Sequence, residues 1–255
     1  MGTPDPGRAA SAASVRIRQS SSGQLTTLGE IEHPRSIRSF VMRGGRITEA
    51  QQRALQLLWP KYGIPFEPAP LDLEAAFGRA APITLEIGFG NGDNLAALAA
   101  VHPERNYLGV EVHRPGVGRL LLSLEERGLS NARIICHDAV EVLTQQVAPH
   151  TLDEVLILFP DPWPKKRHHK RRLVQAPFVE LVTDRLRVGG VVRFASDWQP
   201  YADAVLELLN ANPRLRNVSP DERFVPRPTE RNPTRFEKRG ERLGHDVWDL
   251  AFERR

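Results

Sequence analysis

The stretch from Leu152 to Arg172, LDEVLILFPDPWPKKRHHKRR, combines three features that rarely occur together. Its apolar run, Val155 to Phe159, predicts a fully buried strand. Asp161 follows between two prolines, which indicates a turn at the end of that strand. Six cations and two histidines then fall within eight residues. This order favours an active-site edge that faces a polyanion, although a solvated charge run is an equal alternative for the basic block by itself.

Length and charge limit the kind of protein. The chain has 255 residues, of which 40% are hydrophobic, which suits one domain with an extension or two small domains. Its net charge of +4 is only mildly basic, but the cations concentrate in residues 165–172 and 223–242. Two basic segments that fold onto one face would attract phosphates. We therefore expect a nucleic acid as partner.

Other classes of protein are excluded by what the sequence lacks. Cys136 is the only cysteine, which rules out an intrachain disulfide and a cysteine cluster for zinc. His168 and His169 have no acidic residue nearby in the sequence, so we expect no metal site. No apolar run approaches the ~18 residues of a membrane-spanning helix. We expect a cytoplasmic protein without a membrane partner, either a monomer or, as an alternative, a homodimer.

The chain divides into three segments. Residues 1–35 are rich in Ser, Ala, Gly and Pro, which predicts a disordered extension. Residues 36–70 form a basic segment that leads into a helix, and residues 71–255 contain the main domain. The helix is expected to begin with a capping box and to end at a proline and a glycine, on the residues Thr48, Gln51, Pro60 and Gly63.

From residue 82 onward, strands and helices alternate. This alternation predicts an α/β fold with a largely parallel sheet that helices cover on both faces. The expected strands are 83–87, 106–112, 132–136, 155–159 and 191–195, with a closing strand at 246–252. The expected helices are 94–101, 116–127, 139–147, 173–186 and 201–209.

Unusual residues gather where such sheets bind ligands, beyond the carboxyl ends of the strands. Gly88, Gly90 and Gly92 allow a sharp turn and a close approach of the backbone to a ligand. The turn lacks the last glycine of the dinucleotide-binding pattern, since Asp93 stands there. A glycine turn alone is weak evidence for a binding site.

Three carboxylates lie at three successive strand ends beside this turn. Glu86 precedes the glycines, Glu111 ends the second strand, and Asp138 follows the third. Glu111 could accept hydrogen bonds from both hydroxyls of a ribose, and Asp138 could reach an adenine amino group. The turn contains no cation to hold a pyrophosphate, and Glu86 would repel one. An adenosine cofactor that is cationic fits better, which indicates S-adenosylmethionine.

Several of these motifs resemble those of the bacterial tRNA (guanine-N7)-methyltransferases, over roughly residue 35 to the C-terminus. The matching stretches are Leu85–Gly92, Gly109–Gly118, Cys136–Ala139, Phe159–Trp163 and Thr234–Gly240. The resemblance implies a class I methyltransferase (Rossmann-like) fold: a three-layer sandwich whose seven-stranded sheet is mostly parallel with an antiparallel last strand. It also implies methyl transfer from S-adenosylmethionine to N7 of a guanine in the variable loop of tRNA.

The resemblance also implies a role for individual residues. The cofactor would be bound by Glu86, Gly88, Gly90, Glu111, Asp138 and Asp161. The substrate guanosine would be contacted by Lys165, Asp197, Thr234, Arg235, Phe236 and Glu237. The RNA would be contacted by Arg167, His168, His169, Lys170, Arg171 and Arg172.

The expected chemistry fits these residue types. Guanine N7 carries a free lone pair, so the reaction chiefly needs positioning and a carboxylate near the developing cation. Asp161 is the candidate for that carboxylate; at ~4 Å and an effective dielectric near 20 the pair is worth about 4 kcal/mol. Whether Asp161 acts as a base or as an electrostatic stabiliser is open. Methylation of another base position and a non-catalytic RNA-binding protein with a vestigial cofactor pocket are the alternatives.

Overall fold

The computed structural model describes residues 46–229, 231, 237 and 246–255. Contacts divide the chain into two units, and every described residue belongs to the second, Ile37–Arg255. The predicted extension, residues 1–35, lies outside the described residues. Within the described ranges, none of the helices combines the length and the apolar character that crossing a membrane requires.

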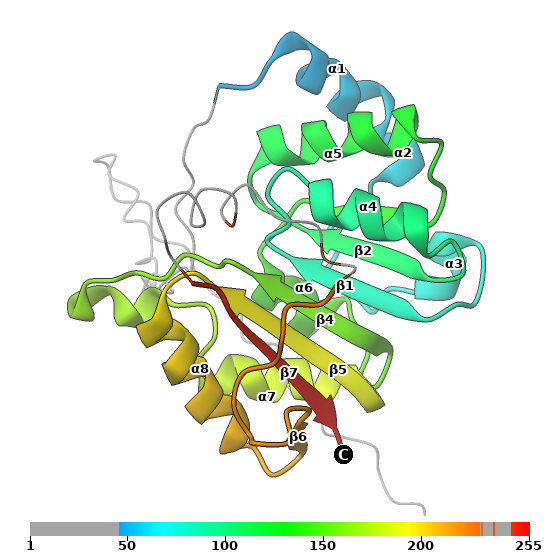
Figure 1. Cartoon of the computed structure of the whole chain (residues 1–255). Helices are drawn as coiled ribbons and strands as arrows, with labels where there is room; N and C mark the ends of the chain where they lie inside the picture. Colours follow the sequence, from blue (N-terminus) through cyan, green and yellow to red (C-terminus); the bar gives the residue numbers. More distant parts are fainter. Residues whose placement is uncertain (1–45, 230, 232–236, 238–245) are drawn as a thin grey trace, which may run out of the picture. The chain divides into compact units, whose positions relative to one another are not determined.

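Strands in the described part of the chain form one mixed sheet in the order β3-β2-β1-β4-β5-β7-β6 (Figure 1). Neighbouring strands from β3 to β5 are parallel, whereas β7 is antiparallel to both of its neighbours. This confirms the predicted mostly parallel sheet of seven strands with an antiparallel last strand. The strands are β1 (Ile83–Ile87), β2 (Asn106–Val110), β3 (Ala132–Ile135), β4 (Leu152–Leu158), β5 (Leu186–Ser196), β6 (Leu215–Asn217) and β7 (Trp248–Arg254).

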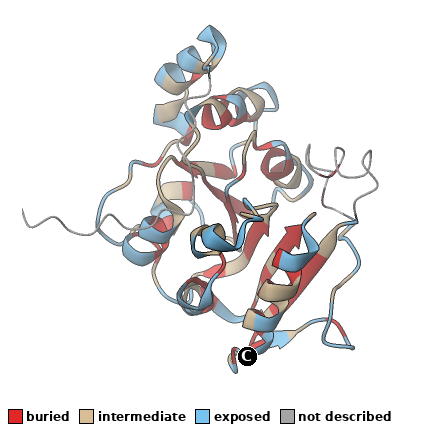
Figure 2. Cartoon of the chain, turned by 90° about the vertical axis from the view of Figure 1, so that its left-hand side faces the viewer, coloured by how far each residue is buried: buried red, intermediate tan, exposed pale blue. Residues whose placement is uncertain are grey.

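Helices cover both faces of the sheet. Figure 2 shows the buried strands between helices whose outer sides are exposed. Two apolar clusters correspond to these two faces. One face carries α1 (Glu49–Leu57), α2 (Trp59–Tyr62), α4 (Asp93–Val101) and α5 (Arg114–Glu126). The other carries α3 (Leu73–Phe77), α6 (Ala139–Gln145), α7 (Ala176–Arg185) and α8 (Gln199–Asn210). The predicted three-layer α/β architecture is therefore confirmed.

The sequence prediction and the structure differ mainly in the lengths of elements. Both β4 and β5 extend beyond their expected ranges, and β6 was not expected as an element because three residues are too few to show a pattern. Strand β1 is buried at all five positions, including the polar residues Thr84 and Glu86 that alternate with its apolar ones. A strand of this kind must have helices on both of its faces.

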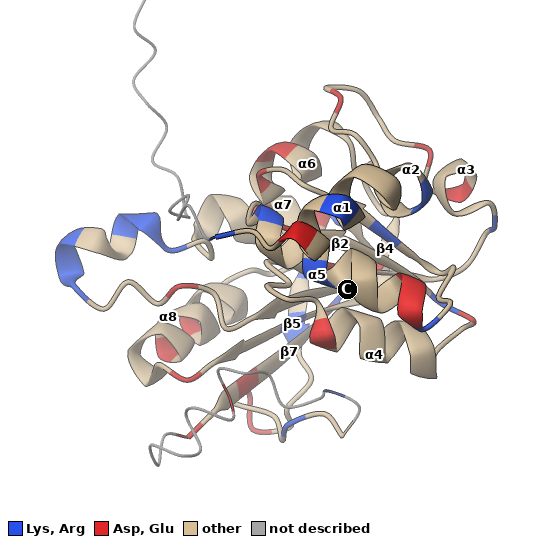
Figure 3. Ribbon diagram, turned by 90° about the horizontal axis from the view of Figure 1, so that it is seen from above, with Lys and Arg blue, Asp and Glu red and all other residues tan. Residues whose placement is uncertain are grey.

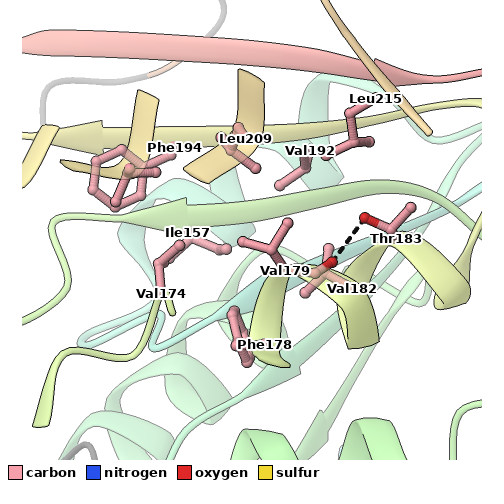
Figure 4. Close-up of a pocket in the computed structure, with 11 residues that line it drawn as sticks. Ile157, Val174, Phe178, Val179, Val182, Thr183, Val192, Phe194, Leu209 and Leu215 are labelled. Atoms are coloured by element: carbon pink, nitrogen blue, oxygen red, sulfur yellow. Dashed lines mark hydrogen bonds between the residues drawn. The ribbon is translucent and has the colours of Figure 1, made fainter. Parts of the chain in front are cut away.

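The core beneath β4 and β5 is closely packed (Figure 4). Side chains from α7, β5 and α8 leave a void of only about 10 Å³, no larger than one water molecule. The Thr183 hydroxyl, which borders this void, donates to the Val179 carbonyl at 2.7 Å. The other residues around it are Ile157, Val174, Phe178, Val182, Val192, Phe194, Val205, Leu209 and Leu215. We interpret this region as a rigid support for the ends of β4 and β5.

The capping box at the start of α1 is present as expected. The Gln51 amide donates to the Thr48 hydroxyl at 3.3 Å, and the Thr48 amide donates to the Gln51 side chain at 2.9 Å. Pro60, however, does not end this helix: α1 stops at Leu57, and Pro60 lies in the first turn of α2. Proline suits that place because an amide hydrogen there would have no partner within the helix.

Helix α1 packs against α5 at a glycine. A β-carbon on Gly118 would lie 2.8 Å from the Gln51 β-carbon and 2.9 Å from its carbonyl oxygen. The two helices can approach this closely only because residue 118 has no side chain. The segment before residue 71 is therefore joined to the α/β unit through α5.

We predict that Gly118→Ala destabilises the protein although alanine is the better helix former. The gain in helix propensity is roughly 0.5–1 kcal/mol, whereas overpacking against the Gln51 backbone costs about 1–3 kcal/mol. The free energy of unfolding, measured in urea, should fall by about 1 kcal/mol. Glu126→Ala, at the exposed end of α5, is the control and should stay within roughly 0.5 kcal/mol. A more stable Gly118 variant would contradict close packing of α1 on α5.

Candidate active site

The order of the strands creates one edge at which ligand-binding residues can meet. Strand β1 pairs with β2 on one side and with β4 on the other, both parallel, so the chain order reverses at β1. A cavity of about 240 Å³ opens at the carboxyl ends of these strands, the place where such folds bind ligands. Its walls are Ile87, Gly88, Gly90, Val110, Glu111, Val112, His137, Asp138, Ala139, Leu158, Phe159, Pro160, Asp161 and Leu173.

The glycine turn after β1 leaves open space above its backbone. Gly88 and Gly90 have φ angles of 71° and 58°, a conformation that L side chains rarely adopt. A β-carbon added to either would meet no atom within 4 Å. On the far side, the turn is held by α5, where a β-carbon on Gly116 would lie 2.0 Å from the Gly90 carbonyl oxygen. The turn is thus fixed from behind and accessible from the cavity.

Glu111 is fixed at the end of β2 by three backbone amides. Its Oε1 accepts hydrogen bonds from Val112 at 2.7 Å and His113 at 2.9 Å, and its Oε2 accepts one from Gly90 at 2.9 Å. Each carboxylate oxygen can accept more than one hydrogen bond. Glu111 therefore connects the glycine turn to β2 and can still receive hydroxyl groups from the cavity.

Asp138 lines the cavity at the start of α6. Its Oδ1 caps the helix by accepting hydrogen bonds from the amides of Val140 at 2.8 Å and Glu141 at 3.1 Å. Next to it, the His137 ring stacks on Phe66, with centroids 3.6 Å apart and planes 9° from parallel. The sequence analysis missed this aromatic pair. The only signal in the sequence was that His137 is next to Asp138. Phe66 is so distant in the sequence that its contact with His137 could not be predicted.

Glu86 is not among the residues that line the cavity, and its contact with the cofactor stays a prediction. It is 3% exposed on β1 and accepts a hydrogen bond from the Asn94 side chain of α4 at 3.1 Å. Burial raises the pKa of the Glu86 carboxyl to about 7; the bond from Asn94 opposes this shift, and the Glu111 charge adds to it. Its partner Asn94 lies in the first turn of α4, which begins directly after Gly92.

Asp161 lies in a turn with unusual backbone geometry. Phe159 and Trp163, at the two ends of this turn, have φ angles of 52° and 44°. Such values are outliers for bulky side chains and store strain. The turn begins where the Phe159 amide donates to the Ala195 carbonyl at 2.8 Å. Asp161 is exposed between these ends and lines the cavity.

The basic segment follows this turn as the 3₁₀ helix η1 (Lys166–Arg171). Figure 3 shows its cations at one side of the molecule. Lys165, Lys166, Arg167 and Lys170 are exposed, and Arg171 places its guanidinium 5.1 Å from the centre of the Trp163 ring. His168 and His169 are half-buried; desolvation, followed by the charges of Arg167 and Arg171, lowers the pKa of His168.

Arg172 differs from its neighbours in being buried, and its predicted contact with RNA stays a prediction. Its side chain is 7% exposed. Its Nε donates to the Pro162 carbonyl at 2.9 Å, and its guanidinium lies 4.6 Å from the centre of the buried Tyr201 ring. These contacts fix the guanidinium beneath the turn that carries Asp161. The sequence analysis grouped Arg172 with the exposed cations because composition does not reveal burial.

Of the residues predicted to contact guanosine, none that the structure describes lines the cavity. Lys165 is exposed and directly follows the Asp161 turn, and Asp197 is half-buried just after β5; neither lines the cavity. Residues 234–236 lie outside the described residues. Glu237 is 1% exposed, and its Oε1 lies 2.9 Å from the Arg231 Nη2.

Arg231 is the centre of a buried ion cluster that the sequence analysis missed. Its Nη2 also donates to Asp249 on β7 at 2.8 Å, and Arg227 approaches Glu237 at 3.5 Å. Burial raises the pKa of the Asp249 carboxyl to about 6, although the Arg231 charge opposes this shift. The sequence could not reveal the cluster, because its members come together only when the chain after β6 folds back onto β7.

The charges of the cavity indicate the ligand it can hold. Among the described residues that line it, three are carboxylates and none is Lys or Arg. A pyrophosphate would find no cation there, whereas a ligand with positive charge and hydroxyl groups fits. S-adenosylmethionine has both, so the residues present suit it. In the described ranges, no group of three or more His, Cys, Asp and Glu side chains could hold a metal ion.

Comparisons with known proteins agree with the resemblance expected from the sequence motifs. The model of the methyltransferase family Methyltransf_4 matches residues 80–250. The chain is 55% identical to a tRNA (guanine-N(7)-)-methyltransferase of Yersinia enterocolitica, over 87% of this chain and 92% of that protein. Proteins of the same name from Pseudomonas fluorescens and Stutzerimonas stutzeri are 53% and 56% identical, covering 90% and 86% of this chain and 95% and 92% of their own. At this identity over nearly the full length of these relatives, the chain belongs to the family of tRNA (guanine-N(7)-)-methyltransferases.

Proposed function

We propose that this protein transfers a methyl group from S-adenosylmethionine to N7 of a guanine in tRNA, the guanosine of the variable loop. One observation carries the proposal. A cavity at the carboxyl ends of β1, β2 and β4 is lined by Glu111, Asp138 and Asp161, and the exposed cations of η1 follow directly after Asp161. The names of the relatives supply the substrate. Because tRNA is the proposed partner, we place the protein in the cytoplasm.

Each wall of the cavity has a proposed role toward the cofactor. The open backbone at Gly88 and Gly90 would lie against the methionine part. Glu111 would accept the ribose hydroxyls while the three amides keep its carboxylate in place. Asp138 would receive the adenine amino group. S-adenosylmethionine supplies an electrophilic methyl group on a cationic sulfur, which suits a cavity with acidic walls.

The lone pair of guanine N7 forms the new bond to the methyl carbon, and the sulfur keeps the electrons of the broken bond. No proton has to leave N7, so no base is needed for the attack. Positive charge moves from the sulfur to the purine. We propose that Asp161 stabilises this charge electrostatically, since a fixed carboxylate is effective where charge develops. Prolines on both sides of Asp161 and the strained turn limit its movement, which favours such a role.

The surface beside the cavity suits the proposed RNA partner. Lys165, Lys166, Arg167 and Lys170 are exposed on or next to η1. Phosphate contacts of this kind position a nucleic acid without reading its sequence. Methylation of a different base atom and RNA binding without catalysis remain as alternatives. Nucleoside analysis of tRNA after incubation with labelled cofactor separates all three, because each gives a different labelled product or none.

We predict that Asp161→Asn impairs methyl transfer while leaving the fold intact. The substitution keeps the shape but removes the charge that faces the developing cation, so the single-turnover rate should fall about 10²–10³-fold. The free energy of unfolding should change by less than roughly 0.5 kcal/mol, since the residue is exposed in a turn. The rate is measured with saturating tRNA and cofactor. A rate equal to wild type would remove Asp161 from catalysis.

A matched pair of substitutions tests the cofactor site. Glu111→Gln should weaken binding of S-adenosylhomocysteine by roughly 1–2 kcal/mol, the size of charge-assisted hydrogen bonds. Glu126→Gln makes the same chemical change at the exposed end of α5, outside the cavity, so it should alter binding by less than twofold. Isothermal titration calorimetry measures both. Equal losses, or a larger loss for the Glu126 variant, would place the cofactor differently from this proposal.

The salt dependence of tRNA binding tests η1. Arg167→Gln combined with Lys170→Gln removes two exposed charges, which should flatten the slope of log affinity against log salt by about 1.5–2. Arg127→Gln combined with Arg255→Gln removes two exposed charges elsewhere and should leave the slope unchanged. Affinities are measured by fluorescence anisotropy at several salt concentrations. Equal slopes for both double variants would mean that η1 is a solvated surface.

A further inference from the structure

The turn that presents Asp161 requires restraint from the rest of the protein. The left-handed conformations of Phe159 and Trp163 are unfavourable, so they persist only where surrounding contacts impose them. The prolines at 160 and 162 fix their own φ angles, but they do not fix the residues at the ends. The contacts that hold these two ends therefore determine where the Asp161 carboxylate lies.

Arg172 restrains the second half of the turn. Its Nε donates to the Pro162 carbonyl at 2.9 Å, and its Nη2 lies 3.2 Å from the His169 Nε2. The face of its guanidinium lies over Tyr201 of α8, a side chain that is fully buried. Arg172 thus connects the carbonyl next to Asp161 both to η1 and to the core of the domain.

Arg231 restrains the first half of the turn. Its guanidinium lies 5.4 Å from the centre of the Phe159 ring, while Nη2 binds the carboxylates of Glu237 and Asp249. Its Nε and Nη1 are buried and have no hydrogen-bond partner among the residues that the structure describes. A buried ion pair is by itself weak evidence that the pair stabilises the fold. Two buried donors without partners make a net gain in stability less plausible still. A role in positioning accounts for the burial better than a role in stability does.

We propose that Arg172 and Arg231 are positioning residues that hold the two ends of the 159–163 turn and thereby set the place of Asp161. The two arginines come from different parts of the chain. Arg172 directly follows η1, and Arg231 precedes the segment that contains Glu237. The surface at η1 that is proposed to contact tRNA is therefore joined to the Asp161 turn through Arg172. This inference rests on the proposed role of Asp161.

Arg172→Lys is the first test, with Arg133→Lys as its matched control. Arg133 also donates its Nε to a backbone carbonyl, that of Ala76 at 2.9 Å, and also lies over an aromatic ring, Phe77, but it is outside the site. Lysine keeps the charge and loses the planar arrangement of donors. We expect the single-turnover rate of the Arg172 variant to fall 10- to 100-fold, with tRNA affinity and melting temperature equal to those of the Arg133 variant. Equal rates in the two variants would overturn the proposal.

A double-mutant cycle tests whether Arg172 acts through Asp161. If it does, Asp161→Asn combined with Arg172→Lys should be no slower than Asp161→Asn alone. Rate losses that multiply would show that Arg172 acts independently, which overturns the proposal. A wild-type rate for Asp161→Asn would instead reject the role of Asp161. A slow Asp161 variant beside a normal Arg172 variant would reject only the positioning role.

Arg231→Lys tests the other end of the turn. We expect a 10-fold or larger loss of single-turnover rate with S-adenosylhomocysteine affinity changed less than twofold. If this variant does not fold, Phe159→Leu removes the ring that Arg231 contacts and keeps the ion cluster, and the same loss is expected. A normal rate in whichever variant folds would overturn the role of Arg231.

Discussion

The parallel pairing of β1 with both β2 and β4 is the constraint on which the site depends. It brings the carboxyl ends of strands that are far apart in the sequence to one edge, so Gly88, Glu111 and Asp161 border the same cavity. The pairing is maintained because β1 is buried on both faces, between the apolar clusters of the two helix layers. A shift of one strand would separate these residues and eliminate the cavity.

Opposite charges are separated over a short distance in this protein. The cavity walls carry carboxylates, while the exposed cations lie on and beside η1, directly after the turn that carries Asp161. This separation suits a reaction between a cationic cofactor and a polyanionic substrate. The acidic walls favour the positive charge of the cofactor, and the cations attract the phosphates of the substrate. Neither surface has to accommodate the other's ligand.

Burial separates the polar residues of the site region into those packed inside the protein and those exposed at its surface. Glu86, Arg172 and Glu237 have the residue types of a binding site, yet each is buried and makes a hydrogen bond or an ion pair with another part of the chain. A buried charge is tolerated only when it is paired or hydrogen-bonded. Glu86 bonds to the start of α4, Arg172 to the Asp161 turn, and Glu237 to Arg231.

The sequence by itself determined the α/β fold, the parallel sheet, the acids at the strand ends and the family, because apolar periodicity, glycine turns and short motifs are local. Strand β1 and the capping box at Thr48 follow directly from such patterns. Only the tertiary structure decided that Arg172 is buried beneath the Asp161 turn, that Phe66 stacks on His137, and that Arg231 joins Glu237 to Asp249. The physical reason is that burial and long-range ion pairing depend on which segments meet in space, and no local pattern records that.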